Sequence, residues 1–222
     1  MKRRAPRRPS PERAHRRREI IAAAIRLCAE RGMENVSYGD LARATRLSRP
    51  LIYFYFPDLQ TLFMEALLLS SAELHRRFLA AVDPAQPGLA QINAIGRAYF
   101  TFAQEEPALF AFLAHDESKQ PKGHREHPLR ARCLADLDST MSLIVGALQR
   151  GRRDGSIRRD LGDPGKVAVC LWGLTHGLIQ LAITKQPVLE DKLGAPFADL
   201  PAFGLDLIAR SLRAPAKPRP KK

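Results

Sequence analysis

The chain has 222 residues, 45% of them apolar, and a formal net charge of +13. This length and composition suit a globular protein with one domain or two small ones and exclude a fully disordered chain. We expect its apolar runs to be too short and interrupted to span a bilayer, and no apolar segment follows the basic start, so a secretory signal is not indicated. Three widely spaced cysteines form neither a disulfide framework nor a CxxC zinc site. We therefore expect a cytoplasmic protein without a metal or cofactor.

The positive charge is concentrated at the two ends of the chain. Residues 1–18 carry nine Lys or Arg against one Glu, and residues 213–222 carry five cations and no acid, so residues 19–212 are neutral overall. Basic tails attract any polyanion, whether nucleic acid or an anionic membrane, without reading a sequence. They can equally be solvated, solubilising ends. We expect disordered basic tails over 1–10 and 214–222, and these alone do not establish DNA binding.

The first elements are marked by helix caps. Ser10 as N-cap and Pro11 at the first helical position predict the start of a long helix, and Gly32 predicts its end. Ser37 followed by Asp40 is a capping-box signature for a short second helix to about residue 44. A third short helix is expected from about residue 48 to 53 or beyond.

Prolines and polar stretches divide the rest of the chain. Further helices are expected at about 58–82, 89–105, 107–115, 134–153, 164–184 and 200–212, with a loop over 118–128. Asp58 is placed to cap the first of these helices. No stretch has a convincing strand pattern. The sequence therefore predicts an all-α fold of about nine helices.

The stretch SYGDLARATRLSRPLIYFYF, residues 37–56, has the pattern of a helix-turn-helix. Ala42 is a small residue where two helices can cross closely, and the turn lies near Thr45. Apolar residues that would face the core are Leu41, Leu47 and Ile52. In this motif the second helix enters the major groove with its N-terminal residues toward the base edges.

This region resembles the DNA-binding region of the TetR family of transcriptional regulators. Residues that match the family pattern are Ala42, Ser48, Tyr53, Phe56 and Pro57, together with the upstream helix ending at Glu30–Gly32; DGSIRRDL at 154–161 also resembles the family. The resemblance implies a helix-turn-helix DNA-binding domain over 11–57 and a helical ligand-binding and dimerisation domain over 58–213. It also implies a homodimeric repressor that a small, mostly apolar inducer releases from a palindromic operator in double-stranded DNA.

Three residues depart from the family pattern. Arg46 stands where glycine is usual in the turn, and a left-handed conformation costs a non-glycine residue roughly 1 kcal/mol. Tyr55 replaces the usual His, and Leu59 replaces a Lys that would contact phosphate. Arg46 and the arginine-rich tail are candidates to replace that contact.

The four consecutive rings at 53–56 cannot all face one side of a helix. Ile52 and Phe56 are four residues apart and can face the core, which points Tyr53 and Tyr55 outward; if the rings were all core instead, the two phenylalanines would be the strongest members. The resemblance implies that the tyrosines hold phosphates, and Arg49 can read guanine. The expected DNA-binding residues are Ser37, Tyr38, Arg46, Ser48, Arg49, Pro50, Tyr53 and Tyr55.

The larger C-terminal part carries apolar faces for which the resemblance implies two roles. Residues expected at a dimer interface are Val167, Leu171, Leu174, Leu178, Leu181, Phe203, Leu207 and Ile208. Residues expected around a ligand pocket are Tyr99, Phe102, Phe110, Phe112, His115, Asp138, Met141, Trp172 and His176. Packing within one subunit remains the alternative for both sets.

Other functional classes have less support in the sequence. The chain lacks GxSxG, HExxH, a P-loop and GxGxxG, so we expect no enzyme. His124 and His127 lie in a polar stretch that suits a solvated loop better than a metal site. An architectural protein that binds DNA through its tails is the alternative, and a membrane-surface role for the tails is a further one.

Overall fold

The computed structural model describes residues 10–119, 127–194 and 199–215. This part of the chain contains α-helices, one 3-10 turn and an isolated antiparallel bridge between Ile157 and Arg213, with no strand. The all-α prediction is confirmed. The expected tails, except Ser10 and residues 214–215, and most of the expected 118–128 loop lie outside the described residues.

The chain divides into two compact units, each assembled from two stretches of sequence. The first unit comprises Met1–Ser71 and Pro107–Cys133, and the second comprises Ala72–Glu106 and Leu134–Lys222. The dividing point near residue 71 falls inside a helix, whereas the boundary expected from the sequence is at residue 57. The first part of this helix belongs with the first unit, where its Glu65 pairs with Arg17 near the chain's start.

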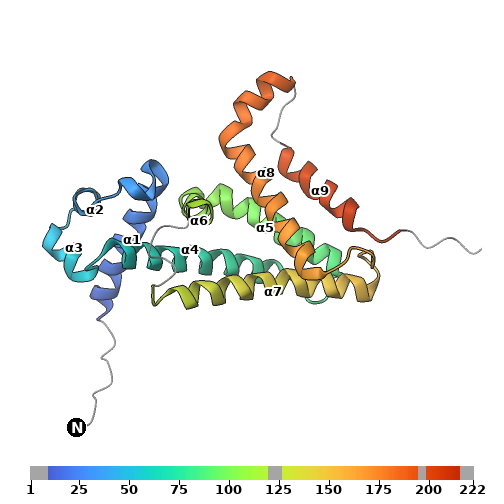
Figure 1. Cartoon of the computed structure of the whole chain (residues 1–222), viewed down its shortest axis with the longest axis horizontal. Coiled ribbons are helices and arrows are strands. Elements are labelled where there is room, and N and C mark those ends of the chain that lie inside the picture. Colours follow the sequence, from blue (N-terminus) through green and yellow to red (C-terminus); the bar gives the residue numbers. More distant parts are fainter. Residues whose placement is uncertain (1–9, 120–126, 195–198, 216–222) are drawn as a thin grey trace, which may run out of the picture. The chain divides into compact units, whose positions relative to one another are not determined.

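The first unit contains α1 (Pro11–Arg31), η1 (Met33–Asn35), α2 (Tyr38–Thr45), α3 (Arg49–Tyr55), the first part of α4 (Leu59–Ala81), and α6 (Pro107–Lys119) (Figure 1). Helix α6 packs against α1. The predicted caps are confirmed: the Ser10 side chain accepts from the Arg13 N–H, and Ser37 and Asp40 form the capping box. Side chains in its core are completely buried, among them Ile20, Leu41, Ile52, Phe56, Leu62 and Met64.

The second unit contains α5 (Gly88–Glu105), most of α7 (Arg130–Asp154), α8 (Pro164–Leu193) and α9 (Leu200–Leu212), with the end of α4 (Figure 1). Helices α5, α8 and α9 contact one another. Glycines permit two close approaches: a Cβ at Gly88 would lie 2.1 Å from the Gly151 nitrogen of α7, and one at Gly204 would lie 2.5 Å from a methyl of Leu178. Larger residues at these positions would force the helices apart.

Two helices extend beyond their predicted ends. Helix α6 continues four residues past the expected end at 115, and α8 continues past the expected end at 184, through Pro187, to Leu193. A proline costs a helix its own N–H bond and creates a clash with the preceding turn, but residues after it can pair again. Here the Gln186 side chain donates to the Glu190 carboxylate at 3.0 Å across Pro187, and Gly194 ends the helix in the left-handed conformation with its N–H bonded to the Glu190 carbonyl.

Helix α8 also corrects the expectation about bilayers. Residues Pro164–Lys192 are long and apolar enough to cross a membrane by length and composition, and only 22% of the most apolar stretch is buried within the chain. The expectation is wrong because the stretch expected as a helix, 164–184, is long enough by itself and carries one charged residue, Lys166. A helix that packs against a second protein surface passes the same test, so composition does not separate the two explanations.

Candidate nucleic-acid interface and interior cavity

Helices α2 and α3 form a helix-turn-helix whose turn contains a left-handed residue. Arg46 ends α2 with φ 57° and ψ 25°, the only positive φ of a non-glycine residue in the described chain. Ser48 then caps α3 by accepting from the Leu51 N–H at 3.4 Å. Ile52 and Phe56 are completely buried and anchor α3. The start of α3, with exposed Ser48, Arg49 and Pro50, is therefore accessible to a binding partner.

The ring cluster divides between core and surface. Tyr53 is 48% exposed and stacks on Tyr38 with ring centroids 3.8 Å apart. The Tyr38 hydroxyl donates to the Phe56 carbonyl at 2.9 Å, and burial raises the pKa of Tyr38. Phe56 is in the core as predicted, whereas Phe54 is 61% exposed, so the alternative in which all four rings lie in the core is wrong. A position two residues from Phe56 on a helix faces away from it, and the Arg13 guanidinium lies 5.1 Å from the Phe54 ring instead.

The Arg49 side chain lies against the first turn of α2. A Cβ at Gly39 would sit 2.8 Å from Arg49 Nη2, so the absence of a side chain there leaves room for the guanidinium. Arg46 and Arg49 are both exposed, and among the described residues neither has a carboxylate partner. Two unpaired cations on the two sides of one turn suit contact with a polyanion.

Ser37 and Tyr55 are more engaged within the protein than expected. The Ser37 hydroxyl donates to the Asp40 carboxylate and accepts from the Asp40 N–H at 3.3 Å. The bond from the Ser37 hydroxyl, a second from the Ser37 N–H at 3.0 Å, and the nearby Arg43 lower the pKa of Asp40 to about 2. Tyr55 is half-buried, and its carbonyl accepts a bond from Arg17. Both residues lie near the helix-turn-helix, but each already has a structural role.

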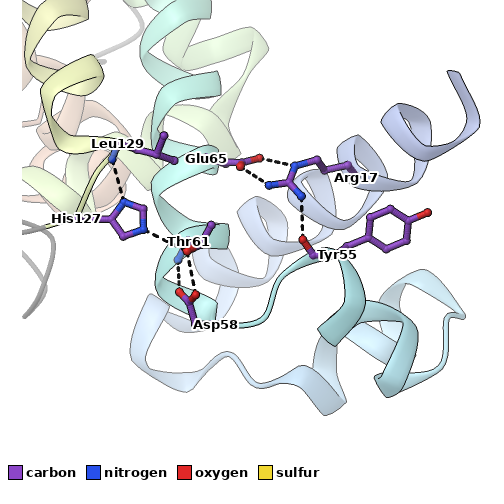
Figure 2. A network of polar contacts seen from close by, with 7 residues as sticks. All are labelled: Arg17, Tyr55, Asp58, Thr61, Glu65, His127 and Leu129. Carbon is purple, nitrogen blue, oxygen red and sulfur yellow. Dashed lines mark hydrogen bonds and ion pairs between the residues drawn. The ribbon is translucent and has the colours of Figure 1, made fainter. Parts of the chain in front are cut away.

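Arg17 joins three elements of the first unit (Figure 2). Its Nη1 donates to the Tyr55 carbonyl at 2.8 Å, where α3 ends, and its Nε donates to Glu65 of α4 at 2.8 Å. Its Nη2 also pairs with Glu65, and its guanidinium lies 4.2 Å from the Phe56 ring. A planar guanidinium can make these bonds in fixed directions at once. Arg17 therefore fixes the end of α3 against α1 and α4.

A second set of bonds lies at the start of α4 (Figure 2). Asp58 accepts from the Thr61 N–H at 2.6 Å and from its hydroxyl at 2.9 Å, which confirms the predicted cap. His127 Nδ1 accepts from the Leu129 N–H at 3.2 Å, so its Nε2, 3.2 Å from the Thr61 hydroxyl, carries the proton of the neutral ring. His124 lies outside the described residues. No cluster of three metal-ligating side chains occurs in the part of the chain that the structure describes.

The second unit encloses a cavity of about 40 Å³ between α5, α8 and neighbouring helices. It is lined mainly by apolar side chains, among them Phe78, Ile92, Ile144 and Leu171, with Tyr99 and Trp172 from the expected pocket set. The Tyr99 hydroxyl lies 2.8 Å from His176 Nδ1, and burial lowers the pKa of His176. The neutral imidazole is thus favoured beside the cavity.

Other expected pocket residues lie elsewhere. Phe102 is completely buried below the Arg77 guanidinium, Met141 is half-buried on α7, and Asp138 is exposed. Phe110, Phe112 and His115 belong to α6 in the first unit, where His115 Nε2 lies 3.5 Å from Glu34 of η1. Helical spacing identifies which residues share a face, but it does not show which neighbour covers that face.

The residues expected at a dimer interface divide by exposure. Leu174, Leu181, Phe203 and Leu207 are 45–61% exposed, Val167 and Leu178 are half-buried, and Leu171 and Ile208 are buried and line the cavity. Sequence reasoning missed further exposed apolar residues on α8: Val169, Ile183 and Val188. It also missed Arg17 and Glu65, which pair across 48 residues and leave no periodic signal, and Asn93, which lines the cavity.

Comparisons with known proteins agree with this architecture. The family model for bacterial regulatory proteins of the tetR family matches residues 20–66, and that for the tetracyclin repressor-like C-terminal domain matches residues 92–200. The HTH-type transcriptional regulator AcrR of Shigella flexneri is 34% identical over 58 residues, or 26% of this chain. That match spans about a quarter of the relative's length, 27%.

Solved structures share the fold across nearly the whole chain. The ketosteroid transcriptional regulator KstR2 of Mycobacterium tuberculosis superposes with a TM-score of 0.70 at 20% identity, covering 90% of this chain and 96% of its own. A putative regulator from Saccharomonospora viridis in complex with choline gives 0.73 at 20%, covering 91% and 100%. FadR of Bacillus subtilis in complex with stearoyl-CoA gives 0.69 at 15%, covering 88% and 99%.

A helix-turn-helix head joined to a larger helical domain defines a class of bacterial DNA-binding regulators. Both family models place this chain in it, one over the head and one over the larger domain. The chain belongs to the TetR family of bacterial regulatory proteins, whose members are transcriptional regulators and not enzymes.

Proposed function

We propose that this TetR-family regulator is a cytoplasmic, homodimeric repressor that binds a palindromic operator and is released by a small, mostly apolar ligand. In this proposal residues 11–57 bind DNA, and residues 58–213 bind the ligand and dimerise. The observation that carries the DNA half is the exposed start of α3, with Ser48, Arg49 and Pro50 held outward by buried Ile52 and Phe56. Such a helix start can enter a major groove.

The expected DNA-binding residues take different parts in this proposal. Arg49 reads a base edge, because a guanidinium can bind guanine O6 and N7 together. Tyr53 and Arg46 contact phosphates, which fixes the position on the duplex. Ser37, Tyr38 and Tyr55 act mainly by holding α2 and α3, since Ser37 and Tyr38 use their hydroxyls and Tyr55 its carbonyl within the protein.

Support for a homodimer comes from the apolar surface of α8 and α9. Leu174, Phe203 and Leu207 are each more than half exposed. Water around such side chains is released when a second copy covers them, at about 25 cal/mol per Å² of apolar area buried. A Cβ added at Gly173 would have no heavy atom of another described residue within 4 Å, so a partner helix has room to approach there. Two copies would present recognition helices about 34 Å apart, the spacing of successive major grooves.

Support for ligand control comes from the cavity of the second unit, which we call the aromatic cavity because Phe78, Tyr99 and Trp172 line it. At about 40 Å³ it is far smaller than an ordinary ligand pocket of about 300–1,000 Å³, so a ligand has to widen it. Binding that widens the cavity favours a different packing of its helices, and the ligand shifts the population toward that packing. Choline and stearoyl-CoA are ligands of the two structural neighbours, and they illustrate the range that this fold accommodates.

Selection of bound sequences from a random DNA pool at physiological salt tests the proposal. We expect a two-fold symmetric motif with half-sites about one helical turn, or a multiple of it, apart. Binding without sequence preference, lost when residues 1–9 and 216–222 are deleted, would instead support an architectural protein that acts through its tails. For the regulator, the same deletion should weaken all sequences similarly and preserve the ratio between them.

A further inference from the structure

A groove of about 440 Å³ lies between α5 and α9 in the second unit, beside the aromatic cavity. Two arginines line it: Arg97 from α5 and Arg213 at the end of α9. Within the described ranges, neither guanidinium has a hydrogen-bond or ion-pair partner. The one carboxylate in the lining, Asp206, is paired with Arg210. The groove therefore has two uncommitted positive charges.

The groove and the cavity share a wall. Asn93 and Leu205 line both spaces. The Asn93 Oδ1 atom is buried without a hydrogen-bond partner, which is costly unless another group supplies one. Leu205 is half-buried, and its Cδ2 lies 2.5 Å from where a Cβ at Gly96 would be. A side chain with rotatable bonds thus separates a basic groove from an apolar cavity.

We propose that the groove and the cavity form one site for an amphipathic anion. The acidic head, a carboxylate, sulfonate or phosphate, binds Arg97 and Arg213, and the apolar body passes Leu205 into the cavity beside Trp172. A polar group near the head satisfies Asn93. None of the described residues that line the cavity is charged, so the charged end of the ligand remains in the groove. This inference rests on the proposed function, because it names the ligand class and the route of entry.

Decanoate and decan-1-ol have the same number of carbon atoms but differ in charge. Comparing them separates this inference from general apolar binding. Isothermal titration of the full-length protein should show decanoate binding about fivefold more tightly, since a guanidinium–carboxylate pair at an exposed site contributes up to about 1 kcal/mol. Arg97→Gln and Arg213→Gln should each weaken decanoate binding by roughly threefold and leave decan-1-ol unchanged. Arg153→Gln is the matched control, because Arg153 is exposed on α7 and lines neither space.

A second variant tests the passage. Leu205→Ala should strengthen decanoate binding by about threefold, because the side chain that must move is shortened. Circular dichroism would establish that each variant is folded. Equal binding of acid and alcohol, or equal effects of Arg97→Gln and Arg153→Gln, would overturn the inference.

Fluorescence anisotropy on the selected operator separates this inference from the proposed function. If decanoate binds through Arg97 and Arg213 but leaves the operator complex intact, the site stands and ligand release of DNA fails. If an apolar compound releases the operator equally from wild type and from the Arg97→Gln, Arg213→Gln double variant, the repressor proposal stands and the anion site fails.

Discussion

The first unit leaves polar and aromatic side chains exposed around a fixed helix, whereas the second leaves aliphatic side chains exposed along α8 and α9. Arg49 and Tyr53 project from α3 while Ile52 and Phe56 secure it from behind. Leu174 and Leu207, by contrast, are 57% and 60% exposed and lie on long helices. The first pattern suits a charged, hydrated partner, and the second suits an apolar one. The two units are thus built for partners of opposite chemistry.

The strongest test of this contrast is a charge on the apolar surface. Leu207→Asp should leave the folded monomer intact but prevent association, because a carboxylate would have to be buried without a partner. Sedimentation velocity should then show a monomer, and operator affinity should fall by about a hundredfold or more as the linkage of two half-site contacts is lost. Leu79→Asp is the matched control, since Leu79 is 56% exposed on α4, outside this surface. A Leu207→Asp protein that remains dimeric would rule out α9 as the interface.

The next largest effect is expected at Arg49. Arg49→Ala should reduce affinity for the selected operator by roughly 10- to 100-fold, corresponding to about 1–3 kcal/mol for one bidentate base contact. Affinity for random DNA should fall much less. Anisotropy titrations on both DNAs measure the ratio. Equal losses on the two would show that Arg49 touches only the backbone.

Gly39→Ala sharpens that result without removing a charge. The new methyl would meet Arg49 Nη2, the far end of a flexible side chain, so Arg49 has to move while the fold persists. Operator affinity should change by a few-fold in the Gly39→Ala variant and be unaffected by the same substitution in an Arg49→Ala background. Additive effects would show that Gly39 acts independently of Arg49.

A smaller effect is expected when the connection from α1 to α3 is cut. Arg17→Met should lower the free energy of unfolding by about 1–2 kcal/mol, because a carbonyl and a carboxylate lose a partly exposed charged donor. Urea denaturation measures it. Arg16→Met is the control, since among the described residues Arg16 pairs with Glu19 of its own helix, and it should leave stability nearly unchanged. Equal losses would argue against a linking role for Arg17.

The smallest effect concerns Asp40 and pH. Its pKa is about 2 in the folded protein against an ordinary 3.8, so the carboxylate stabilises the fold above pH 3.8 and loses this contribution as the pH falls through 2. Asn at this position keeps a hydrogen-bond acceptor but has no charge. The difference in melting temperature between wild type and Asp40→Asn should therefore be full at pH 5 and shrink toward pH 2. A difference that does not change with pH would mean that the charge has no part in the capping box.

Caps and short turns could be predicted from the sequence because they depend on neighbouring residues. The residue types and spacing at Ser10, at Ser37 with Asp40, and at Asp58 are enough to indicate a cap. The resemblance to the TetR pattern, in which glycine is usual at position 46, indicates the left-handed conformation of Arg46. The end of α8 could not be predicted in this way, since a proline only disfavours a helix and the turn after Pro187 regains its bonds.

Features that depend on distant residues could not be predicted. The Arg17–Glu65 pair joins positions 48 residues apart, and Tyr99 meets His176 across 77 residues. A phenylalanine usually lies in the core, but the backbone turns the position of Phe54 to the surface. Residue type predicts burial on average, whereas the angle around one short helix decides it here.

The exposed leucines of α8 and α9 have a consequence for dosage in the cell. If two copies come together only by covering that surface, the active species is formed in proportion to the square of the number of free chains. Halving the supply of chains would then cut occupancy of the control site by up to fourfold. The exposed apolar side chains on these two helices would thereby make occupancy of the DNA site fall more steeply than the number of chains.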